Sequence, residues 1–383
     1  MTDALTAEIV DATSKIGADT WNALAGAADP QGNPFLDHAF FLALEQSGCA
    51  TRRTGWAPRH IILREGDQIT GLMPLFEKSH SQGEYVFDHG WANAFEQAGG
   101  RYYPKLQSAV PFTPVAAPKL LTLGNDPGRK AALLEAAAQI AEANGISSVH
   151  ATFVPPGEAE HAEAAGWLAR TDTQYHWHNA GFRSFEDYLA TLSSRHRKTT
   201  RRERRDAVDG LTVKWLTGSD LTESVWDAFF AFYEDTGQRK WGRPYLNRLF
   251  FSLLSEAMAD RVALVLAFDG ATPIAGSLNL LGKDTLYGRY WGATRHVPFL
   301  HFELCYYQAI DFAIAHGLAV VEAGAQGEHK LARGYVPTTT HSIHWIGHPG
   351  LRDAVARFLR QERAAVTREQ EALNEYTPFR KAR

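Results

Sequence analysis

The second half of the chain carries the clearest alternation of apolar and polar positions. Segments of nine residues, rich in β-branched and aromatic side chains and separated by turn residues, predict strands. The predicted strands are 261–269, 273–281 and 285–293. Apolar residues at helical spacing predict helices at 222–236, 245–258, 300–316 and 350–373. The third of these helices stops at Gly317, as glycine commonly ends a helix.

The same order of elements occurs twice along the chain. The segment ANGISSVH (143–150) aligns without a gap with AHGLAVVE (315–322), and each follows an alanine-rich or apolar helical stretch. The hairpin-like segment 59–71 likewise parallels 261–276. Two dipeptides match at one further offset: Gly166-Trp167 with Gly334-Tyr335, and His176-Trp177 with His344-Trp345. These matches indicate two copies of one structural plan.

Each copy predicts strand, turn, strand, strand, helix, strand, helical turn and strand. This order is typical of an α/β fold with a mixed sheet. We therefore expect a first domain at 1–180 and a second at 181–383. The second domain would contain a basic helix at 193–205 and the C-terminal helix.

Composition restricts the classes of protein to consider. With 383 residues and 45% apolar content, the chain can bury two cores, and its net charge of -4 argues against a globally basic nucleic-acid binder. The two cysteines, Cys49 and Cys305, exclude a disulfide framework and a cysteine zinc site. There is no signal-peptide pattern and no apolar run of about 18 residues. We expect a cytoplasmic protein, with peripheral membrane contact left open.

Two segments of the second copy carry a family resemblance. They are LHFELCYYQAIDFAIAHG (300–317) and VVEAGAQGEHKLARGY (320–335), of which GAQGEHK (324–330) is the most specific part. From residue 33 to about residue 360, the chain resembles the Fem-like predicted N-acyltransferases of bacteria. That group is similar to the Fem-type aminoacyl transferases of peptidoglycan synthesis. The resemblance implies two tandem GNAT (acyl-CoA N-acyltransferase)-like domains with mixed sheets.

One segment departs from the pattern of ordinary acetyltransferases. Those enzymes carry a glycine-rich loop before the central helix, whose backbone N–H groups hold the coenzyme A pyrophosphate. Here the corresponding segment is RHVPFLH (295–301), with a proline, bulky side chains and no glycine. Acetyl-coenzyme A therefore does not follow as the donor. An acyl-carrier thioester, a long acyl-coenzyme A or an aminoacyl-tRNA fits at least as well.

Acyl transfer to an amine needs a group that takes the proton of the nucleophile. Glu322 ends the last buried strand before the loop that holds His329, and α/β sheets place their sites in such loops. Either residue is a candidate base, and the first copy has His150 in place of Glu322. Glu303, in the first turn of the central helix, is a third candidate. The alternatives are surface charge after a strand and stabilisation of a helix start.

Several further side chains are candidates for contact with substrates. They are Lys330, Glu328 and His301 around the second-half site, Tyr290 and Arg289 on opposite faces of a strand, and Asp88 and His89 in the first half. We expect Lys330 to meet an anionic group, and Asp88 and His89 to meet the acceptor. Gly292 would allow close approach of a thioester to the strand. Packing is the alternative for the aromatic and first-half residues.

The segment 195–205 contains seven Arg or Lys residues and is the strongest basic run in the chain. On a helix, such an array can pair with the phosphates of coenzyme A, tRNA or a lipid head group. Arg197, Lys198 and Arg201 are the candidates for this phosphate binding. A solvated helix face is the alternative.

These observations predict an N-acyltransferase that moves an acyl group from a thioester, on coenzyme A or an acyl carrier protein, to a primary amine. An amino-alcohol lipid is one attractive acceptor class. The alternatives are an aminoacyl-tRNA-dependent transferase acting on a peptidoglycan precursor and a non-catalytic protein that binds an envelope ligand. The thioester is a co-substrate, and we expect no bound cofactor. We expect no metal either, because ligand spacing such as His-Glu-x-x-His is absent from the sequence.

Overall fold

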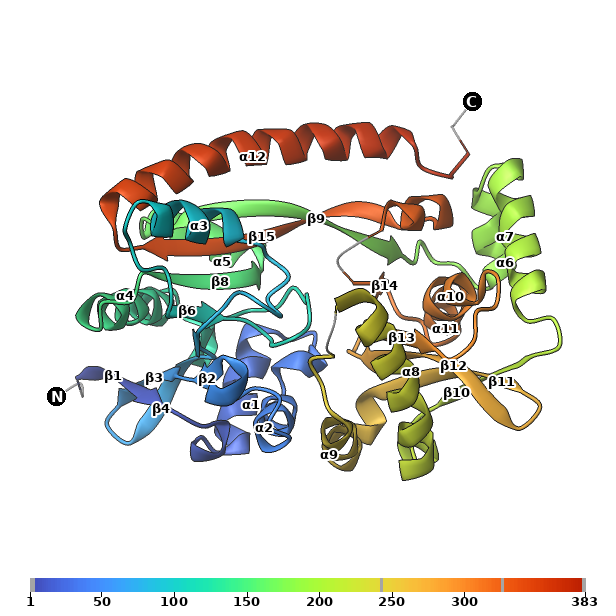
Figure 1. The fold of residues 1–383 in the computed structure, drawn as a ribbon, viewed down its shortest axis with the longest axis horizontal. Coiled ribbons are helices and arrows are strands. Elements are labelled where there is room, and N and C mark those ends of the chain that lie inside the picture. The colour runs from blue at the N-terminus through green and yellow to red at the C-terminus, as the bar shows by residue number, and fades with distance from the viewer. Residues whose placement is uncertain (1–3, 242–243, 325–326, 381–383) are drawn as a thin grey trace. The chain divides into compact units, whose positions relative to one another are not determined.

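The computed structural model describes residues 4–241, 244–324 and 327–380, and divides into two compact units (Figure 1). Unit 1 comprises Met1–Asp172 and Thr339–Arg368, and unit 2 comprises Thr173–Thr338 and Glu369–Arg383. The sequence suggested one boundary at residue 180. Each compact unit instead takes residues from both halves of the chain.

Unit 1 contains two sheets. The first has the order β1-β3-β4-β7 (Leu5–Val10, His60–Glu65, Gln68–Met73, Leu121–Thr122). The second has the order β15-β8-β6-β5-β2 (Val336–Ile346, Ser148–Val154, Lys105–Ser108, Phe76–Lys78, Trp56–Pro58). Because β8 pairs in parallel with β6 and antiparallel with β15, the second sheet is mixed. The helices are α1 (Ala18–Ala28), α2 (His38–Gln46), α3 (His89–Gln97), α4 (Pro127–Ala143), α5 (Pro156–Ala164) and most of α12 (Pro349–Glu375).

Unit 2 is built on strands in the order β10-β11-β12-β13-β14-β9 (Thr212–Leu216, Val262–Asp269, Thr272–Leu281, Thr285–Ala293, Val320–Glu322, Leu168–His178). Its helices are α6 (Phe185–Thr191), α7 (Ser194–Ala207), α8 (Glu223–Trp241), α9 (Arg248–Met258), α10 (Leu300–Phe302) and α11 (Gln308–Ala315). A π-helical turn, Glu303–Tyr307, joins α10 to α11. All predicted helices are present, and the three predicted strands begin and end within one residue of the prediction. The prediction of an α/β fold with mixed sheets is confirmed.

The internal repeat has an unexpected structural outcome in its last strands. β9 ends the first repeat and β15 ends the second. β9 pairs with β14, which places His176 opposite Glu322, whereas β15 pairs with β8, which places His344 opposite His150. Each repeat therefore gives its last strand to the sheet of the other repeat.

Equivalent helices cover the sheets in the two units. In unit 1, α4 packs Leu134 and Ala137 against Val149 of β8. In unit 2, α11 packs Ile310 against Val321 of β14. Each buried aliphatic side chain of this size contributes about 1.5–3 kcal/mol. The two helix–strand pairs, predicted from the alignment of 143–150 with 315–322, thus form the centre of each core.

Candidate functional site

The pairing of the parallel strands β13 and β14 ends at Glu322, one of the candidate bases. Their pairing runs from Thr285 with Val320 to Tyr287 with Glu322. β14 then ends, while β13 continues to Ala293. The carboxyl ends of parallel strands are where α/β folds place ligands. Glu322 therefore lies at the carboxyl end of the paired segment.

A β-bulge in β13 directs Arg289 toward this point. Leu278 of β12 lies opposite Tyr290, but the next residue, Asn279, lies opposite Gly288, so that Arg289 is the extra residue. Bulges commonly re-aim a side chain in this way. The Arg289 side chain is 1% exposed, and its Nη2 lies 2.8 Å from Oε2 of Glu322.

Two further titratable side chains, His176 and Lys330, lie near Arg289 and Glu322. Nε2 of His176 lies 4.0 Å from Oε1 of Glu322, and burial lowers the pKa of His176 although the carboxylate acts to raise it. The Lys330 ammonium donates to the carbonyl oxygen of Gly324 at 2.8 Å. Burial, and to a lesser extent Arg289, lowers the pKa of Lys330 to about 7. Lys330 therefore holds the loop that follows β14. Its ammonium is buried, whereas the predicted contact with an anionic group of a substrate would need it to be exposed.

His329 stands among aromatic rings at the surface of unit 2. Its side chain is exposed, and its Nε2 lies 2.8 Å from the hydroxyl of Tyr306. The ring centroids of His301 and Phe302 lie 6.1 Å and 5.6 Å from that of His329. His329 thus adjoins residues that line a cavity.

That cavity, of about 600 Å³, extends from the end of β13 to α10. It is lined by Thr236, Trp291, Ala293, Arg295, His296, Val297, Pro298, Phe299, Leu300, His301 and Phe302. Most of its lining is apolar, and Phe299 adopts a left-handed backbone conformation (φ 62°) immediately before α10. The glycine-free segment predicted to replace a phosphate loop therefore forms one wall of an apolar cavity.

Gly292 has a different role from the one that the sequence suggested. A Cβ atom at this position would lie 2.0 Å from the backbone oxygen of Phe232 in α8. The glycine is thus required for the packing of α8 on β13. Tyr290, from the same strand, packs its ring 5.2 Å from that of Tyr233.

Glu303 is largely enclosed by other side chains, and it also lines a second cavity, of about 480 Å³. It is 2% exposed, and both of its oxygens accept from Arg204 of α7, at 3.1–3.3 Å. Gln308 donates to Oε1 of Glu303 at 2.8 Å. Arg204 also reaches Asp311. This network attaches the basic helix to the first turn of the central helix.

The three predicted phosphate ligands lie on α7 with different surroundings. Arg201 pairs with Glu186, Lys198 is exposed and Arg197 is half-buried. The side chain of Glu328 falls outside the described part of the chain, so its predicted contact with substrate has no structural counterpart here.

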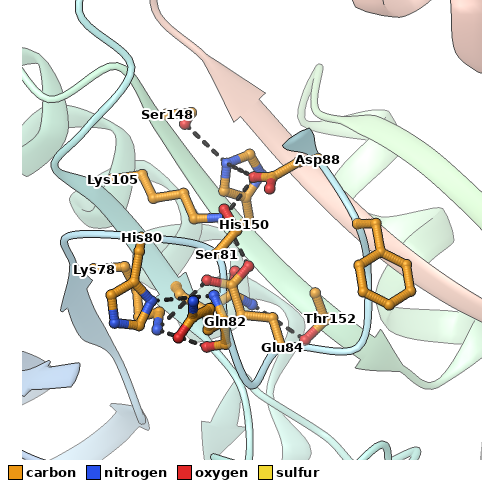
Figure 2. Close-up of polar contacts among 12 residues, drawn as sticks. Lys78, His80, Ser81, Gln82, Glu84, Asp88, Lys105, Ser148, His150 and Thr152 are labelled. Atoms are coloured by element: carbon orange, nitrogen blue, oxygen red, sulfur yellow. Dashed lines mark hydrogen bonds and ion pairs between the residues drawn. The ribbon is translucent and has the colours of Figure 1, made fainter. Parts of the chain in front are cut away.

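Unit 1 contains a buried cluster of charged groups that the sequence did not predict (Figure 2). The Lys105 ammonium of β6 donates to Ser81 at 2.8 Å, Glu84 at 2.7 Å and Asp88 at 2.5 Å. Lys78 contacts the other oxygen of Glu84 at 3.7 Å. Figure 2 shows these side chains converging from the 79–88 loop and the adjoining strands. Oδ2 of Asp88 is therefore occupied by protein partners, whereas Oδ1 is buried without a hydrogen-bond partner among the described residues.

The pKa values in this cluster reflect burial opposed by neighbouring charges. Burial raises the pKa of Glu84 to about 7 and lowers that of Lys78 to about 7. Burial acts to raise the pKa of Asp88, but Lys105 and His150 hold it well below its usual range. His89, the other predicted acceptor contact, is exposed at the start of α3.

The repeat offers the signal that could have found part of this cluster. In the alignment of the two copies, His150 corresponds to Glu322 and His344 corresponds to His176. The Nδ1 atoms of His150 and His344 lie 2.7 Å apart. Burial lowers the pKa of His150 to about 3. Both units thus hold a facing pair of titratable side chains at the equivalent strand position.

Comparison with solved structures defines a class of fold. A crystal structure of FemX matches with a TM-score of 0.53 at 12% identity, over 89% of this chain and 98% of that one. The C-terminal domain of a putative lysylphosphatidylglycerol synthetase from Agrobacterium fabrum matches with a TM-score of 0.53 at 9% identity, over 90% and 96%. A conserved protein of unknown function from Bacteroides thetaiotaomicron matches with a TM-score of 0.54 at 12% identity, over 88% and 99%. The chain therefore has the fold that FemX has.

The sequence comparison gives the family. The FemAB-like family model, described as peptidoglycan biosynthesis and recognition, matches residues 12–381, so the chain belongs to this family. No curated protein matches the sequence at a significant level. Family membership together with the fold supports a transferase. Within the described residues, no helix is long and apolar enough to cross a membrane.

Proposed function

We propose that the protein is an N-acyltransferase that moves an acyl group from a thioester to a primary amine, with an amino-alcohol lipid as the favoured acceptor class. The observation that carries this proposal is the apolar cavity of about 600 Å³ beside His329. An apolar cavity accommodates an acyl chain, because burying its methylene groups is favourable by about 0.8 kcal/mol each. The cavity begins at the end of β13, the strand that pairs in parallel with β14.

The reaction requires a proton to leave the attacking amine. The amine nitrogen attacks the thioester carbonyl carbon, a C–N bond forms and the C–S bond breaks. The nitrogen gives its proton to a base, and the sulfur leaves as a thiol after taking up a proton. We assign the base to His329, because it is exposed beside the cavity lining and its ring is fixed by the Tyr306 hydroxyl.

Glu322 takes a positioning role in this proposal. Glu322 is 7% exposed, and Arg289 contacts its carboxylate, so this ion pair orders the end of β14. Lys330 fixes the following loop through the Gly324 carbonyl. Both side chains would therefore act on the reaction through the position of His329.

A steady-state assay with matched variants tests the proposal. Purified protein is incubated with acyl thioesters of several chain lengths and a panel of primary amines, and amide product is measured by mass spectrometry. His329→Ala should lower kcat by about 100-fold or more, the range for loss of a general base. The control is His316→Ala, an exposed histidine at the end of α11. Undiminished kcat in His329→Ala would refute the base assignment, and no amide from any pair would refute the function.

A second function is favoured by the family description. Peptidoglycan biosynthesis suggests an aminoacyl-tRNA-dependent transferase acting on a peptidoglycan precursor. It would use the same site, with an aminoacyl ester in place of the thioester. Transfer of a labelled amino acid from charged tRNA to a precursor, without amide formation from thioesters, would favour it. Copurification of an unmodified envelope ligand with neither activity would favour the non-catalytic alternative.

A further inference from the structure

The helix α7 presents one uniformly basic face to solvent. Its exposed cationic side chains are Arg195, Lys198, Arg201, Arg202 and Arg205. The buried positions, Thr200, Glu203 and Ala207, lie on the other side of the helix. No aromatic or aliphatic side chain is exposed on α7. The face is therefore a compact array of charge without an apolar component.

Most of this charge is available to a partner. Arg201 pairs with Glu186 and Arg205 with its neighbour Asp206, and both pairs are solvent-exposed. Within the described part of the chain, no ion pair involves Arg195, Lys198 or Arg202. In a chain with a net charge of -4, this local excess of cations requires an explanation other than overall composition.

The inner side of α7 is attached to the wall of the apolar cavity. Glu203 accepts from Arg333 at 2.8 Å and from the Tyr307 hydroxyl at 2.5 Å. The Arg333 guanidinium in turn lies 3.5 Å above the ring of Phe302, which lines the cavity. Arg204 holds Glu303, the residue after Phe302. The basic face and the contacts with the cavity wall therefore lie on opposite sides of α7, so a partner on the basic face would stand about one helix width, roughly 10 Å, from that wall.

We propose that this face docks an acidic acyl carrier protein, which delivers the acyl chain on its phosphopantetheine arm. The inference rests on the proposed function and adds the identity of the donor. Complementary charge across such a surface steers association and fixes orientation. The thioester then exchanges as above: the C–S bond to the arm breaks, and the carrier protein leaves with a free thiol.

Other anionic partners fit this surface less well. A membrane would favour exposed apolar side chains among the cations, which α7 lacks. Single-stranded RNA is commonly held by stacking on aromatic side chains, and α7 exposes none. Coenzyme A would need its pyrophosphate held close to the cavity, where the segment 295–301 offers a proline and bulky side chains instead of glycines.

A pair of charge-reversal variants tests the docking surface. Arg195→Glu with Arg202→Glu changes the basic face, and the control Arg357→Glu with Arg360→Glu makes the same charge change on exposed positions of α12. Binding of a purified holo fatty-acid carrier protein is measured by fluorescence anisotropy at two salt concentrations. Transfer is measured with one acyl chain presented on the carrier protein, on coenzyme A and on N-acetylcysteamine.

The expected result is a loss of carrier binding of about tenfold or more in the α7 variant, with less than about a twofold change in the control. The ratio of kcat/KM for the carrier-bound donor to that for the N-acetylcysteamine donor should fall by a similar factor. An unchanged ratio, or an equal fall with coenzyme A, would overturn the proposal. Binding of tRNA or anionic vesicles that depends on α7, with no carrier binding, would also overturn it.

The binding measurement separates this proposal from the proposed function. If the wild-type protein binds the carrier through α7 but forms no amide from any thioester, the proposed function fails and the docking surface stands. If amide forms from coenzyme A or N-acetylcysteamine donors while the carrier does not bind, the function stands and the docking surface fails.

Discussion

Replacing Lys105 by methionine would remove the cation that Asp88 and Glu84 share, and would leave Glu84 with Lys78 alone, at 3.7 Å. The side chain of Lys105 is fully buried, that of Glu84 is 1% exposed and that of Asp88 is 4% exposed. Removing one partner of a buried ion pair costs about 3–5 kcal/mol, because the remaining charge stays desolvated. At about 2–4 °C per kcal/mol for a unit of this size, the unfolding temperature should fall by roughly 6–20 °C.

The loss in Lys105→Met should depend on pH in a defined direction. Burial already raises the folded-state pKa of Glu84 to about 7, against an unfolded value of 4.5. A carboxyl with a raised folded pKa lowers stability as pH rises from its unfolded pKa through its folded pKa. Without Lys105 this pKa should rise further, so the deficit of the variant should be larger at pH 8 than at pH 5.

Differential scanning calorimetry at the two pH values, with a second substitution, gives the decisive comparison. Adding Glu84→Gln to Lys105→Met removes one of the two buried carboxylates, so the double variant should recover part of the lost stability, and its pH dependence should be smaller. An unfolding temperature for Lys105→Met within about 2 °C of the wild type would refute the argument, because the cluster would then contribute no more than a surface pair.

Three further predictions concern unit 2. Gly292→Ala should destabilise the protein by about 1–3 kcal/mol or more in urea unfolding, because its Cβ would meet a backbone oxygen of α8 at 2.0 Å; wild-type stability would contradict the packing role. The pKa of Lys330 is about 7 in the folded protein and 10.5 in the unfolded chain, so the free energy of unfolding should rise with pH between these two values. Lys330→Met should lower this slope by up to about 1.4 kcal/mol per pH unit. If urea unfolding gives the same slope for the variant and the wild type, the prediction is wrong. Arg204→Met should lower the free energy of unfolding by about 3–5 kcal/mol, because it leaves the buried Glu303 carboxylate without its cation. Arg205→Met, on the exposed side of α7, should lower it by about 0–1 kcal/mol. Equal losses of stability in thermal unfolding would contradict this difference.

The elements of unit 2 could be predicted because each carries its own local pattern. The strand 285–293 alternates side chains and is bounded by turn residues, and the structure has it at the same residues. Gly317 marks the end of the central helix, and it adopts the positive φ (67°) that this position requires. Local signals of this kind depend only on residues that are neighbours in the sequence, so they can be recognised before the fold is known.

The candidate site was predicted less completely, because its contacts join distant parts of the sequence. The sequence predicts both His301 and His329 around one second-half site, and their ring centroids lie 6.1 Å apart. The pairing of Glu303 with Arg204 joins residues 99 positions apart, and no local pattern indicates it. The same holds for the bulge that turns Arg289 toward Glu322, since a bulge depends on the register between two strands.

The exchange of β9 and β15 places a condition on how the protein is made. Unit 1 cannot complete its mixed sheet or bury Trp91 fully until the chain has been synthesised past Leu359, because that core also contains the start of α12. During translation, the edge of β8 that later receives β15 stays unpaired while nearly 190 further residues emerge. Unpaired strand edges invite association with other chains. Ribosome-bound intermediates of this protein should therefore depend on chaperones, and a gene split between β9 and α6 should yield two fragments that fold only when produced together.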